Sequence, residues 1–289
     1  MKENIKSILC SIVLISLMVF LSCDNIEEDN FLVYPKGQTS QSTPITKNTS
    51  KQRILLEDYT GWKCTNCPRA AQKAAELITK YGEELVVMAV HSTSWATPSA
   101  ANNNLDFRTE YGEKWADKFS CTALPTGLIS RINSSGTFTN SDATWDNKIQ
   151  EALSLKEHIM DINLGVELKE DNKVLVSTEN VFLKPVSYPT LISIMIVESG
   201  IKGVQLNGDA TFGAVPKIED YTFNHVLRKN ALIDYSLSSN GVESGTTISK
   251  NYILDIDNDI KDIENCEVIV FVSNSQTSEI VQVNHIEIQ

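Results

Sequence analysis

The segment Arg53–Ala71, RILLEDYTGWKCTNCPRAA, decides the fold that we expect for this chain of 289 residues. Its first part, Arg53–Tyr59, is mostly apolar and predicts a short strand. Pro68–Tyr81 predicts a helix, because its alanine, leucine and isoleucine residues fall on one face and a glycine follows it. Cys64 and Cys67 stand between the two elements. A CxxC pair that follows a strand and opens a helix has the context of a redox motif.

The rest of the chain shows two different patterns. Up to about residue 157, strands and helices alternate and predict a mixed α/β layer, with strands at 85–90 and 126–132 and helices at 105–119 and 142–156. Beyond it, the long helical patterns end and short alternating stretches follow, at 161–171, 173–183, 190–199, 246–256, 267–275 and 279–288. The sequence therefore predicts an α/β domain at 53–157, followed by an antiparallel β-sandwich at 158–289.

Residues 1–22 have the pattern of a secretory signal. Two lysines precede the apolar run Ile8–Leu21, which is shorter than the roughly 20 residues of a membrane-spanning helix. The run ends in Leu-Ser-Cys, which resembles the bacterial lipobox. That resemblance implies that Cys23 is the lipidated first residue of the mature protein, and an ordinary signal that ends near a cysteine is the alternative. Acidic residues at 24–29 are compatible with retention in the outer membrane.

Residues 23–52 connect the expected anchor to the first strand. Ser, Thr, Gln, Asn and Lys dominate from Gly37 to Gln52, and this composition predicts a flexible tether.

Composition excludes several classes of function. The formal net charge is −12, which argues against nucleic acid as a partner, because phosphate binding needs clustered Lys and Arg. Neither of the glycine-rich phosphate-binding motifs occurs. We therefore expect no nucleotide and no other cofactor. The hydrophobic fraction of 42% is sufficient for a true core. Nothing in the composition indicates an oligomeric state.

The two cysteines of the CxxC motif carry the strongest chemical signal. Near the start of a helix, the helix dipole favours the thiolate of Cys64, and the neighbouring Lys63 favours it further. A zinc site is disfavoured because no second CxxC or HxxxH pair occurs. A purely structural disulfide is the alternative to a redox pair. Asp255, Asp257 and Asp259 do not form a calcium loop, because the glycine and glutamate that such a loop needs are missing, so we expect no metal.

Two further cysteines, Cys121 and Cys266, leave two interpretations open. If the loop before Pro125 faces the CxxC pair, Cys121 is close enough to act as a third redox thiol. Alternatively, Cys121 and Cys266 form a disulfide between the two domains, since the compartment beyond the inner membrane is oxidising.

The segment around the CxxC pair resembles the thioredoxin fold. Asp58, at the end of the first strand, matches the buried acid that the resemblance makes the proton acceptor of the second cysteine. Trp62 lies where an aromatic residue shields the site. Leu124-Pro125-Thr126 precedes a strand, as the cis-proline of that fold does, and an ordinary trans proline is the alternative. Between the cysteines stands Thr-Asn instead of Gly-Pro, which leaves the direction of electron flow open.

A second resemblance extends over nearly all of the mature chain. The lipobox, the polar stretch, EDYTGWKCTNCP and the motif NHVLR at Asn224–Arg228 together resemble the 28-kilodalton outer-membrane protein family of envelope lipoproteins. The resemblance implies a lipid-anchored protein in the outer membrane, periplasmic or surface-exposed. It does not imply an enzymatic activity.

Two functional hypotheses follow. The leading one is a thiol–disulfide oxidoreductase of the cell envelope, whose partners are protein thiols and disulfides. Cys64 attacks, Cys67 resolves, Asp58 relays the proton, and Pro125 shapes the substrate groove. The supporting residues are Lys63, Trp62 and Thr126. The rival is an interaction or structural lipoprotein, in which the sandwich binds a partner and the CxxC is a structural disulfide.

Overall fold

The computed structural model describes residues 37–260 and 262–288 of the chain, and these belong to one compact unit. The expected signal at 1–22, the lipidated Cys23 and the start of the tether lie outside the described residues. Among the helices of the described part, none is long and apolar enough to cross a membrane.

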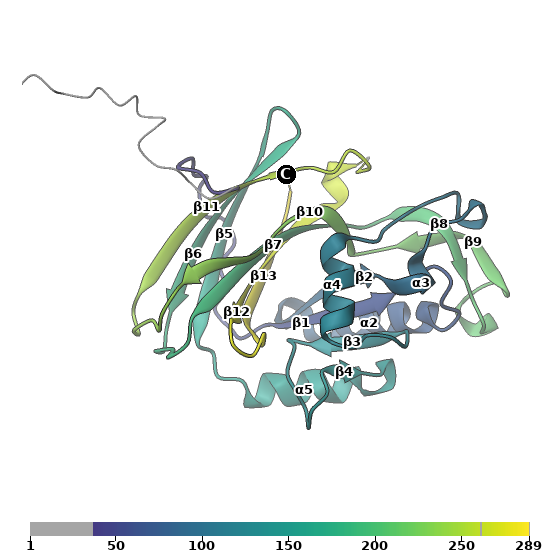
Figure 1. The fold of residues 1–289 in the computed structure, drawn as a ribbon, viewed down its shortest axis with the longest axis horizontal. Helices are drawn as coiled ribbons and strands as arrows, with labels where there is room; N and C mark the ends of the chain where they lie inside the picture. The colour runs from purple at the N-terminus through teal and green to yellow at the C-terminus, as the bar shows by residue number, and fades with distance from the viewer. Residues whose placement is uncertain (1–36, 261, 289) are drawn as a thin grey trace, which may run out of the picture. The chain divides into compact units, whose positions relative to one another are not determined.

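Strands and helices alternate in the first half of the chain, and strands make up nearly all of the second half (Figure 1). The first half contains β1 (Ile54–Thr60), α2 (Cys67–Tyr81), β2 (Leu85–His91), α3 (Thr93–Ala96), α4 (Glu110–Lys118), β3 (Thr126–Ile129), β4 (Thr139–Asn140) and α5 (Trp145–Leu155). The second half contains β5 (Met160–Lys169), β6 (Lys173–Phe182), β7 (Thr190–Glu198), β8 (Ile201–Leu206), β9 (Lys217–Phe223), β10 (Val226–Ser238), β11 (Thr247–Asp255), β12 (Cys266–Asn274) and β13 (Ile280–Glu287).

The strands form three sheets. The largest has eight strands in the order β13-β12-β7-β10-β2-β1-β3-β4. In it, β1 pairs with β2 in parallel and with β3 in the antiparallel direction. The second sheet is β11-β6-β5, and the third is the isolated hairpin β8–β9. The fold is therefore mixed α/β with mostly β structure.

Helices cover the two faces of the β1–β2–β3 region because its strands are apolar on both sides. Every residue of β1 and β2 is buried, as expected for strands inside a layered fold. One face packs against α2 and α5, through Ala70, Leu77 and Trp145 among others. The other face packs against Trp115 of α4. Gly127 of β3 lies directly under Trp145, where a Cβ atom would lie 2.4 Å from the indole nitrogen.

The switch from helices to strands falls between α5 and β5, close to residue 158, where the sequence predicts a domain boundary. The two stretches nevertheless share a sheet, since Val226 of β10 pairs in parallel with Ala89 of β2. They also share a core, because the cluster around Trp115 includes Met195 and Phe271 from the second half. We define this cluster, with Leu55, Tyr59, Val86, Met88, Val90, Ala116, Phe119, Cys121, Leu128, Val197, Leu227, Ile269, Ile280 and Val283, as the shared core.

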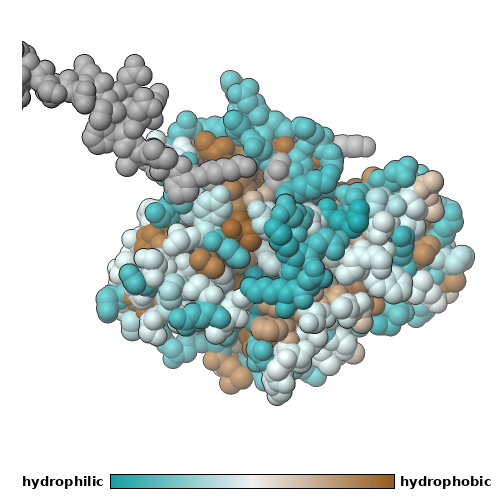
Figure 2. Space-filling view, in the orientation of Figure 1, coloured by the Kyte–Doolittle hydropathy of each residue, from teal (hydrophilic) through white to brown (hydrophobic). Residues whose placement is uncertain are grey.

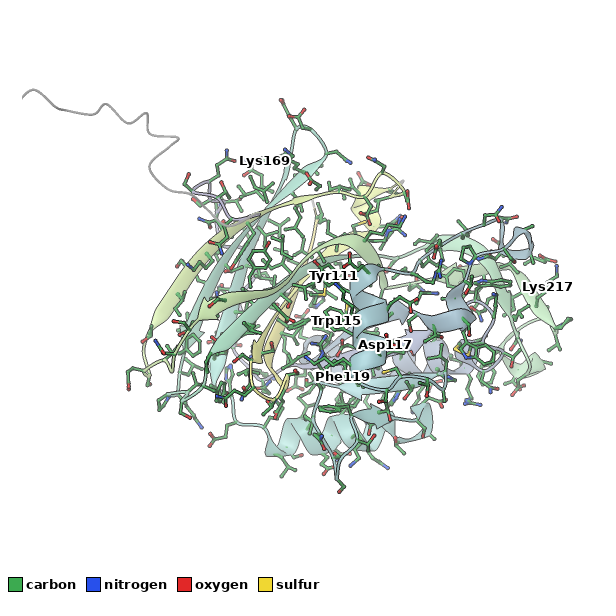
Figure 3. All side chains as sticks on the ribbon, viewed as in Figure 1. Tyr111, Trp115, Asp117, Phe119, Lys169 and Lys217 are labelled. Atoms are coloured by element: carbon green, nitrogen blue, oxygen red, sulfur yellow. A yellow bond between two sulfur atoms is a disulfide. The ribbon has the colours of Figure 1, made fainter. Side chains whose placement is uncertain are left out.

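A buried ion pair lies beside the shared core. Glu57 of β1 accepts two hydrogen bonds from Arg131, each 2.8 Å long, and both side chains are almost fully buried. The Arg131 guanidinium also stacks against three aromatic rings, with its Cζ atom 4.4 Å from the ring centre of Trp115, 5.1 Å from that of Phe119 and 4.9 Å from that of Phe271. Trp115 and Phe119 are labelled in Figure 3, on α4 and at its end. Two of these rings come from the α4 region and one from β12, so the pair ties the two halves together.

The second half forms a two-layer arrangement in which β5, β6 and β11 pack against β7 and β12. Its core contains Ile162, Val176, Tyr252, Ile194 and Val270, all fully buried. This agrees with the alternating pattern of the sequence, which buries one face of each strand. On the face of the molecule drawn in Figure 2, hydrophobic residues lie in small groups between hydrophilic and neutral ones.

Residues 37–52, predicted as a flexible tether, are held on the three-stranded sheet instead. Thr39 N–H donates to the Asn251 carbonyl of β11 at 3.1 Å, and Ile253 N–H of β11 donates to the Gly37 carbonyl at 2.7 Å. Thr43 N–H donates to Ser177 Oγ on β6 at 2.9 Å. Further along, Lys47 forms a bridge with Leu164 of β5. The prediction is therefore wrong for this segment, which we call the strap. Its polar composition reflects hydrogen bonding to the sheet.

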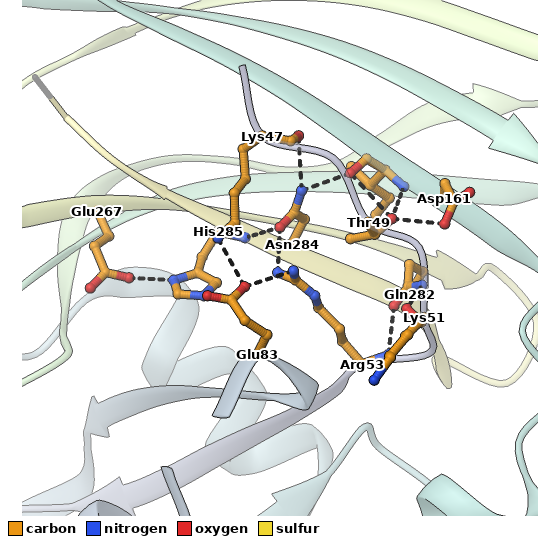
Figure 4. A network of polar contacts seen from close by, with 11 residues as sticks. Lys47, Thr49, Lys51, Arg53, Glu83, Asp161, Glu267, Gln282, Asn284 and His285 are labelled. Carbon is orange, nitrogen blue, oxygen red and sulfur yellow. Dashed lines mark hydrogen bonds and ion pairs between the residues drawn. The ribbon is translucent and has the colours of Figure 1, made fainter. Parts of the chain in front are cut away.

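The strap reaches the first strand through a polar network (Figure 4). Thr49 Oγ1 accepts from Ile162 N–H at 2.9 Å and donates to Asp161 at 3.0 Å. Lys47 and Arg53 both pair with Glu83, at 2.8 Å and 2.7 Å. Gly165 permits the crossing, because a Cβ atom there would lie 2.1 Å from the Pro44 carbonyl oxygen.

Candidate redox site

Cys64 and Cys67 form a disulfide in the loop that joins β1 to α2, with their Cα atoms 5.4 Å apart. The loop turns tightly: Cys64 N–H donates to the Gly61 carbonyl at 3.0 Å, and Cys67 N–H donates to the Cys64 carbonyl at 3.2 Å. Only glycine fits at position 61, since a Cβ atom would lie 2.6 Å from the backbone of Trp95 in α3. Helix α2 begins at Cys67, so Cys64 lies just ahead of it, as the sequence predicts.

Both cysteines are buried, with exposed fractions of 3% for Cys64 and 2% for Cys67. In the disulfide form, exposure does not distinguish them.

Asp58 lies near the end of β1 and lines the same cavity as Cys67. The carboxyl group is 3% exposed, and within the described residues its Oδ1 has no hydrogen-bond partner. Burial, assisted by the negative charge of Asp142, raises the pKa of Asp58 to about 7. Asp142 itself pairs with Arg69 of α2 at 2.7 Å. A carboxyl group with this pKa accepts and releases a proton near neutral pH, which general acid–base catalysis requires.

The cavity has a volume of about 350 Å³ and lies between α2, the sheet and the β9 region. Alanines of α2 and the apolar residues Ile78 and Val87 form much of its wall. Asp58, Thr60, His91, Gln205 and His225 contribute polar groups. Burial and the nearby charge of Arg228 lower the pKa of His91 to about 3, so its ring is neutral and packs edge-on against Phe107 and Phe223.

The supporting residues predicted from the sequence lie around the same loop. Trp62 is buried, and its indole N–H donates to the Thr97 carbonyl at 2.7 Å. Lys63 places its ammonium group 5.4 Å from the centre of the Trp62 ring. Thr126 pairs with Tyr59 of β1, so Pro125 precedes a strand that begins beside the end of β1, where the CxxC loop follows. The Leu124–Pro125 peptide bond is cis, as the thioredoxin resemblance implies.

Cys121 and Cys266 do not form the disulfide that the sequence left open. Both thiols are free and buried, Cys121 in the shared core and Cys266 in the core of the second half. Burial is the main factor that raises the pKa of each thiol to about 12. Cys121 does not line the cavity beside Cys67. A protonated thiol is a poor nucleophile, so the geometry does not favour Cys121 as a third redox thiol.

The hairpin β8–β9 contributes contacts that the sequence did not predict. Gln205 donates from its side-chain amide to the Cys64 carbonyl at 2.9 Å. Leu206 N–H donates to the Trp62 carbonyl at 2.8 Å, and Gly208 N–H donates to the Thr65 carbonyl at 3.0 Å. These residues stand about 140 positions after the CxxC pair, and no local pattern in the sequence connects the two segments.

The NHVLR motif lies where the two halves meet. The His225 carbonyl accepts from Ala89 N–H of β2 at 2.8 Å, and Asn224 accepts from Gly200 N–H at 3.0 Å. Arg228 is buried and pairs with Glu198 of β7 at 3.3 Å. The motif thus holds β10 in place between β7 and β2. Over the described part of the chain, no group of three or more His, Cys, Asp and Glu side chains is placed to hold a metal ion.

Fold and site together define a mixed α/β protein with a buried CxxC disulfide at a strand–helix junction. The sequence profile of the outer membrane protein Omp28 family matches residues 113–289, which is more than half of the chain. The chain therefore belongs to the Omp28 family, and its place is the cell envelope, at the outer membrane. The match begins after the CxxC segment, so the family does not by itself assign a role to the disulfide. No curated protein matches the chain.

Solved structures resemble the chain in fold. HBP35 of Porphyromonas gingivalis aligns with a TM-score of 0.53 and 14% identity, over 84% of this chain and 77% of that one. A protein from Agrobacterium tumefaciens aligns with a TM-score of 0.49 and 9% identity, over 82% and 95% of the two chains. A domain of the outer membrane lipoprotein Omp28 from P. gingivalis aligns with a TM-score of 0.28 and 16% identity, over 45% of this chain and 88% of that one. At these identities only the likeness to HBP35 carries weight, and it concerns the fold alone.

Proposed function

We propose that this protein carries out thiol–disulfide exchange on extracytoplasmic proteins through Cys64 and Cys67, in a thioredoxin-like arrangement formed by β1, α2, β2, α4, β3 and α5. One observation carries the proposal: the buried carboxyl group of Asp58, whose Oδ1 has no hydrogen-bond partner among the described residues and whose pKa is about 7, lines the same cavity as Cys67 of the disulfide. A structural disulfide has no need of a proton acceptor beside it.

The exchange proceeds in two balanced steps. In the reduced protein, the Cys64 thiolate attacks one sulfur of a substrate disulfide. A mixed disulfide forms, the substrate S–S bond breaks, and its second sulfur leaves as a thiolate that takes up a proton from water. Cys67 then transfers its thiol proton to Asp58 and attacks the Cys64 sulfur. The bond between Cys64 and the substrate breaks, and the released substrate thiolate takes up the proton from Asp58. The substrate leaves as a dithiol and Cys64–Cys67 is the oxidised product. The reverse sequence oxidises a substrate dithiol, and the reduction potential of the pair decides the direction.

Attachment to the membrane is a second part of the proposal. The Leu-Ser-Cys sequence at 21–23 supports Cys23 as the lipidated anchor, and the Omp28 family supports the outer membrane as its place. The protein then meets its substrates at one membrane surface.

The test is a mixed-disulfide trap in intact cells. Cys67→Ala keeps the attacking thiol and removes the resolving one, so we expect disulfide-linked adducts that disappear on reduction. The matched control is the double variant Cys64→Ala with Cys67→Ala. It should give none, because the other two thiols of the described residues, Cys121 and Cys266, are buried and protonated at neutral pH, and Cys23 is the lipidated anchor in this proposal. If the single variant forms no adducts while it is folded and exported, the disulfide is structural and the rival hypothesis of an interaction lipoprotein takes its place.

A further inference from the structure

We infer that the hairpin β8–β9 is a lid over the Cys64–Cys67 disulfide, and that Gln205 is the positioning residue that holds it closed. The inference deepens the proposed function and rests on it. It concerns access to the disulfide, which no part of the CxxC motif determines.

The end of β8 and the turn that follows it bond to the CxxC loop at several points. In addition to the two backbone hydrogen bonds from Leu206 and Gly208, the Gln205 side chain donates to Cys64 and, at 3.4 Å, to Gly61. Four carbonyl groups of the loop, from Gly61 to Thr65, therefore bond to the hairpin. Gln205 is 2% exposed. Loss of its amide removes two hydrogen bonds between the segments. The Gly61 and Cys64 carbonyls then keep only their hydrogen bonds within the loop, from Cys64 N–H and Cys67 N–H, which favours separation of the two segments.

Access is what these contacts control. A thiolate attacks a disulfide by approaching one of the two sulfur atoms directly, so that sulfur must be reachable. Cys64 and Cys67 are only 3% and 2% exposed. A protein substrate cannot reach either of them in this arrangement, and exchange requires an opening step.

The hairpin is the element best suited to move. Its two strands pair only with each other and belong to neither of the larger sheets. A two-stranded hairpin on its own is marginally stable. The tip is organised internally, since buried Asn207 donates to the carbonyl groups of Asp209 and Gly213 at 2.8 Å and 3.0 Å. The tip can therefore leave the CxxC loop as one piece, while Phe223 and Val226 stay packed at its base.

The experiment measures access without any protein substrate. The rate at which dithiothreitol reduces the disulfide is recorded for the full chain and for Gln205→Ala, together with hydrogen exchange of the Leu206 and Gly208 amides. If a local opening precedes reduction, the rate scales with the open fraction. We expect an increase of about tenfold in the reduction rate and in the exchange of both amides, with unchanged exchange in β7 and β12. The control is Glu219→Gln, an exposed change on β9 that should alter neither rate.

A second variant keeps the inference testable if Gln205→Ala does not fold. In Gly208→Ala the new Cβ atom lies 3.3 Å from Thr65 Cβ, closer than ordinary van der Waals contact, so the tip or the Thr65 side chain must shift by a few tenths of an ångström. We expect this shift to weaken the contact between tip and loop and to speed reduction as well. Equal reduction rates in wild type and both variants would overturn the lid. So would reduction that follows global unfolding alone, with the same dependence on urea as exchange in β7.

These outcomes are separate from those of the trapping experiment. If Gln205→Ala speeds reduction but Cys67→Ala traps no protein, the lid stands and the proposed exchange function fails. If the trap works and wild-type reduction is already as fast as in the variant, the function stands and the lid fails.

Discussion

Asp58 is the residue whose position is hardest to explain by stability alone. A carboxyl group without a partner in a buried position costs free energy whenever it is ionised. Its neighbours do not relieve that cost, since Asp142 adds a negative charge and His91 is neutral. The pKa of about 7 is the direct consequence. Such a group is retained where its proton is used, which in the proposed exchange is the resolving step at Cys67.

The pH dependence of stability tests this account. The folded-state pKa is raised from 3.8 to about 7, so between these values the folded protein keeps a proton that the unfolded chain has released. The contribution of Asp58 to the free energy of unfolding is therefore fully present below pH 4 and is lost as the pH rises through 7. Asp58→Asn should make the protein more stable at pH 8, by an amount on the order of 4 kcal/mol, with little change at pH 4. Urea denaturation across this range measures it.

A surface acid provides the control for that experiment. The pKa of Asp146 is lowered, mainly by its hydrogen bonds with Lys80 and Tyr81, so its contribution has the opposite sign and is lost as the pH falls. Asp146→Asn should not stabilise the protein at pH 8. An unchanged pH profile in Asp58→Asn would mean that the carboxyl group is ionised and hydrated in solution.

The sequence predicted the local part of the site and missed the distant part. Asp58 stands six residues before Cys64, and one strand–loop–helix unit fixes both positions, so a local pattern was sufficient. Gln205 reaches the site only because β10 brings the second half of the chain against β2. No periodicity encodes that contact, because it depends on how two distant segments pair.

Among the elements, the ion pair between β1 and the end of β3 makes the clearest prediction. Removal of one partner of a buried ion pair leaves an uncompensated charge and costs about 3–5 kcal/mol. Arg131→Met alone should destabilise the protein by that amount, because Glu57 is fully buried. In the double variant Glu57→Gln with Arg131→Met, most of the loss should be recovered, since no charge is left. Urea denaturation of the four proteins of this cycle gives the coupling energy, and additive effects would contradict a direct interaction.

The strap makes a second prediction for the elements. Thr49→Val keeps the shape of the side chain but removes a hydroxyl group that bonds to both Ile162 and Asp161. A buried N–H group loses its partner, so we expect a loss of about 1–3 kcal/mol in the free energy of unfolding. Thr39→Val, whose hydroxyl group accepts only from the neighbouring Gln41 N–H, is the control and should cost far less. Equal stabilities of the two variants would show that the strap is detached in solution.

The long elements were predicted well and the irregular ones were not. Strands such as 173–183 and helices such as 68–81 have strong periodicity, and the structure contains β6 and α2 there. The strap was predicted as flexible because polar composition alone does not tell a mobile linker from a segment bonded to a sheet edge. Strands β8, β9 and β10 were missed because their sequences mix charged and apolar residues without regular alternation.

At the scale of the whole molecule, the first prediction concerns the lipid anchor at Cys23. Cys23→Ser removes the residue that the lipobox resemblance assigns to lipidation. Stable attachment requires two or more acyl chains, which only the lipidated cysteine supplies in this proposal. We expect the variant to move from the membrane to the soluble fraction of the envelope. Cys121→Ser, a change of a buried thiol, is the control and should stay with the membrane. Unchanged membrane association of Cys23→Ser would rule out this anchor.

The last prediction concerns independence of the two halves. The sequence predicts that residues 53–157 fold alone, but the shared core gives the opposite expectation. Without the second half, Leu55, Met88 and Trp115 lose the packing partners that Met195 and Phe271 provide. Exposed apolar surface of this kind costs roughly 25 cal/mol per Å², and a fragment of this size has little stability to spare.

We therefore expect the 53–157 fragment to bind a hydrophobic dye and to lack a cooperative urea transition, whereas residues 37–289 unfold in one step. Cys121→Ala in both proteins prevents oxidation of a thiol that the fragment would expose. A cooperative transition and native-like near-ultraviolet circular dichroism in the fragment would establish two separable domains. In that case the β10–β2 pairing would be a docking contact between them. If the fragment fails and the longer protein succeeds, the CxxC site and the β-rich half form a single folding unit, and the lid over the disulfide is part of the same cooperative structure.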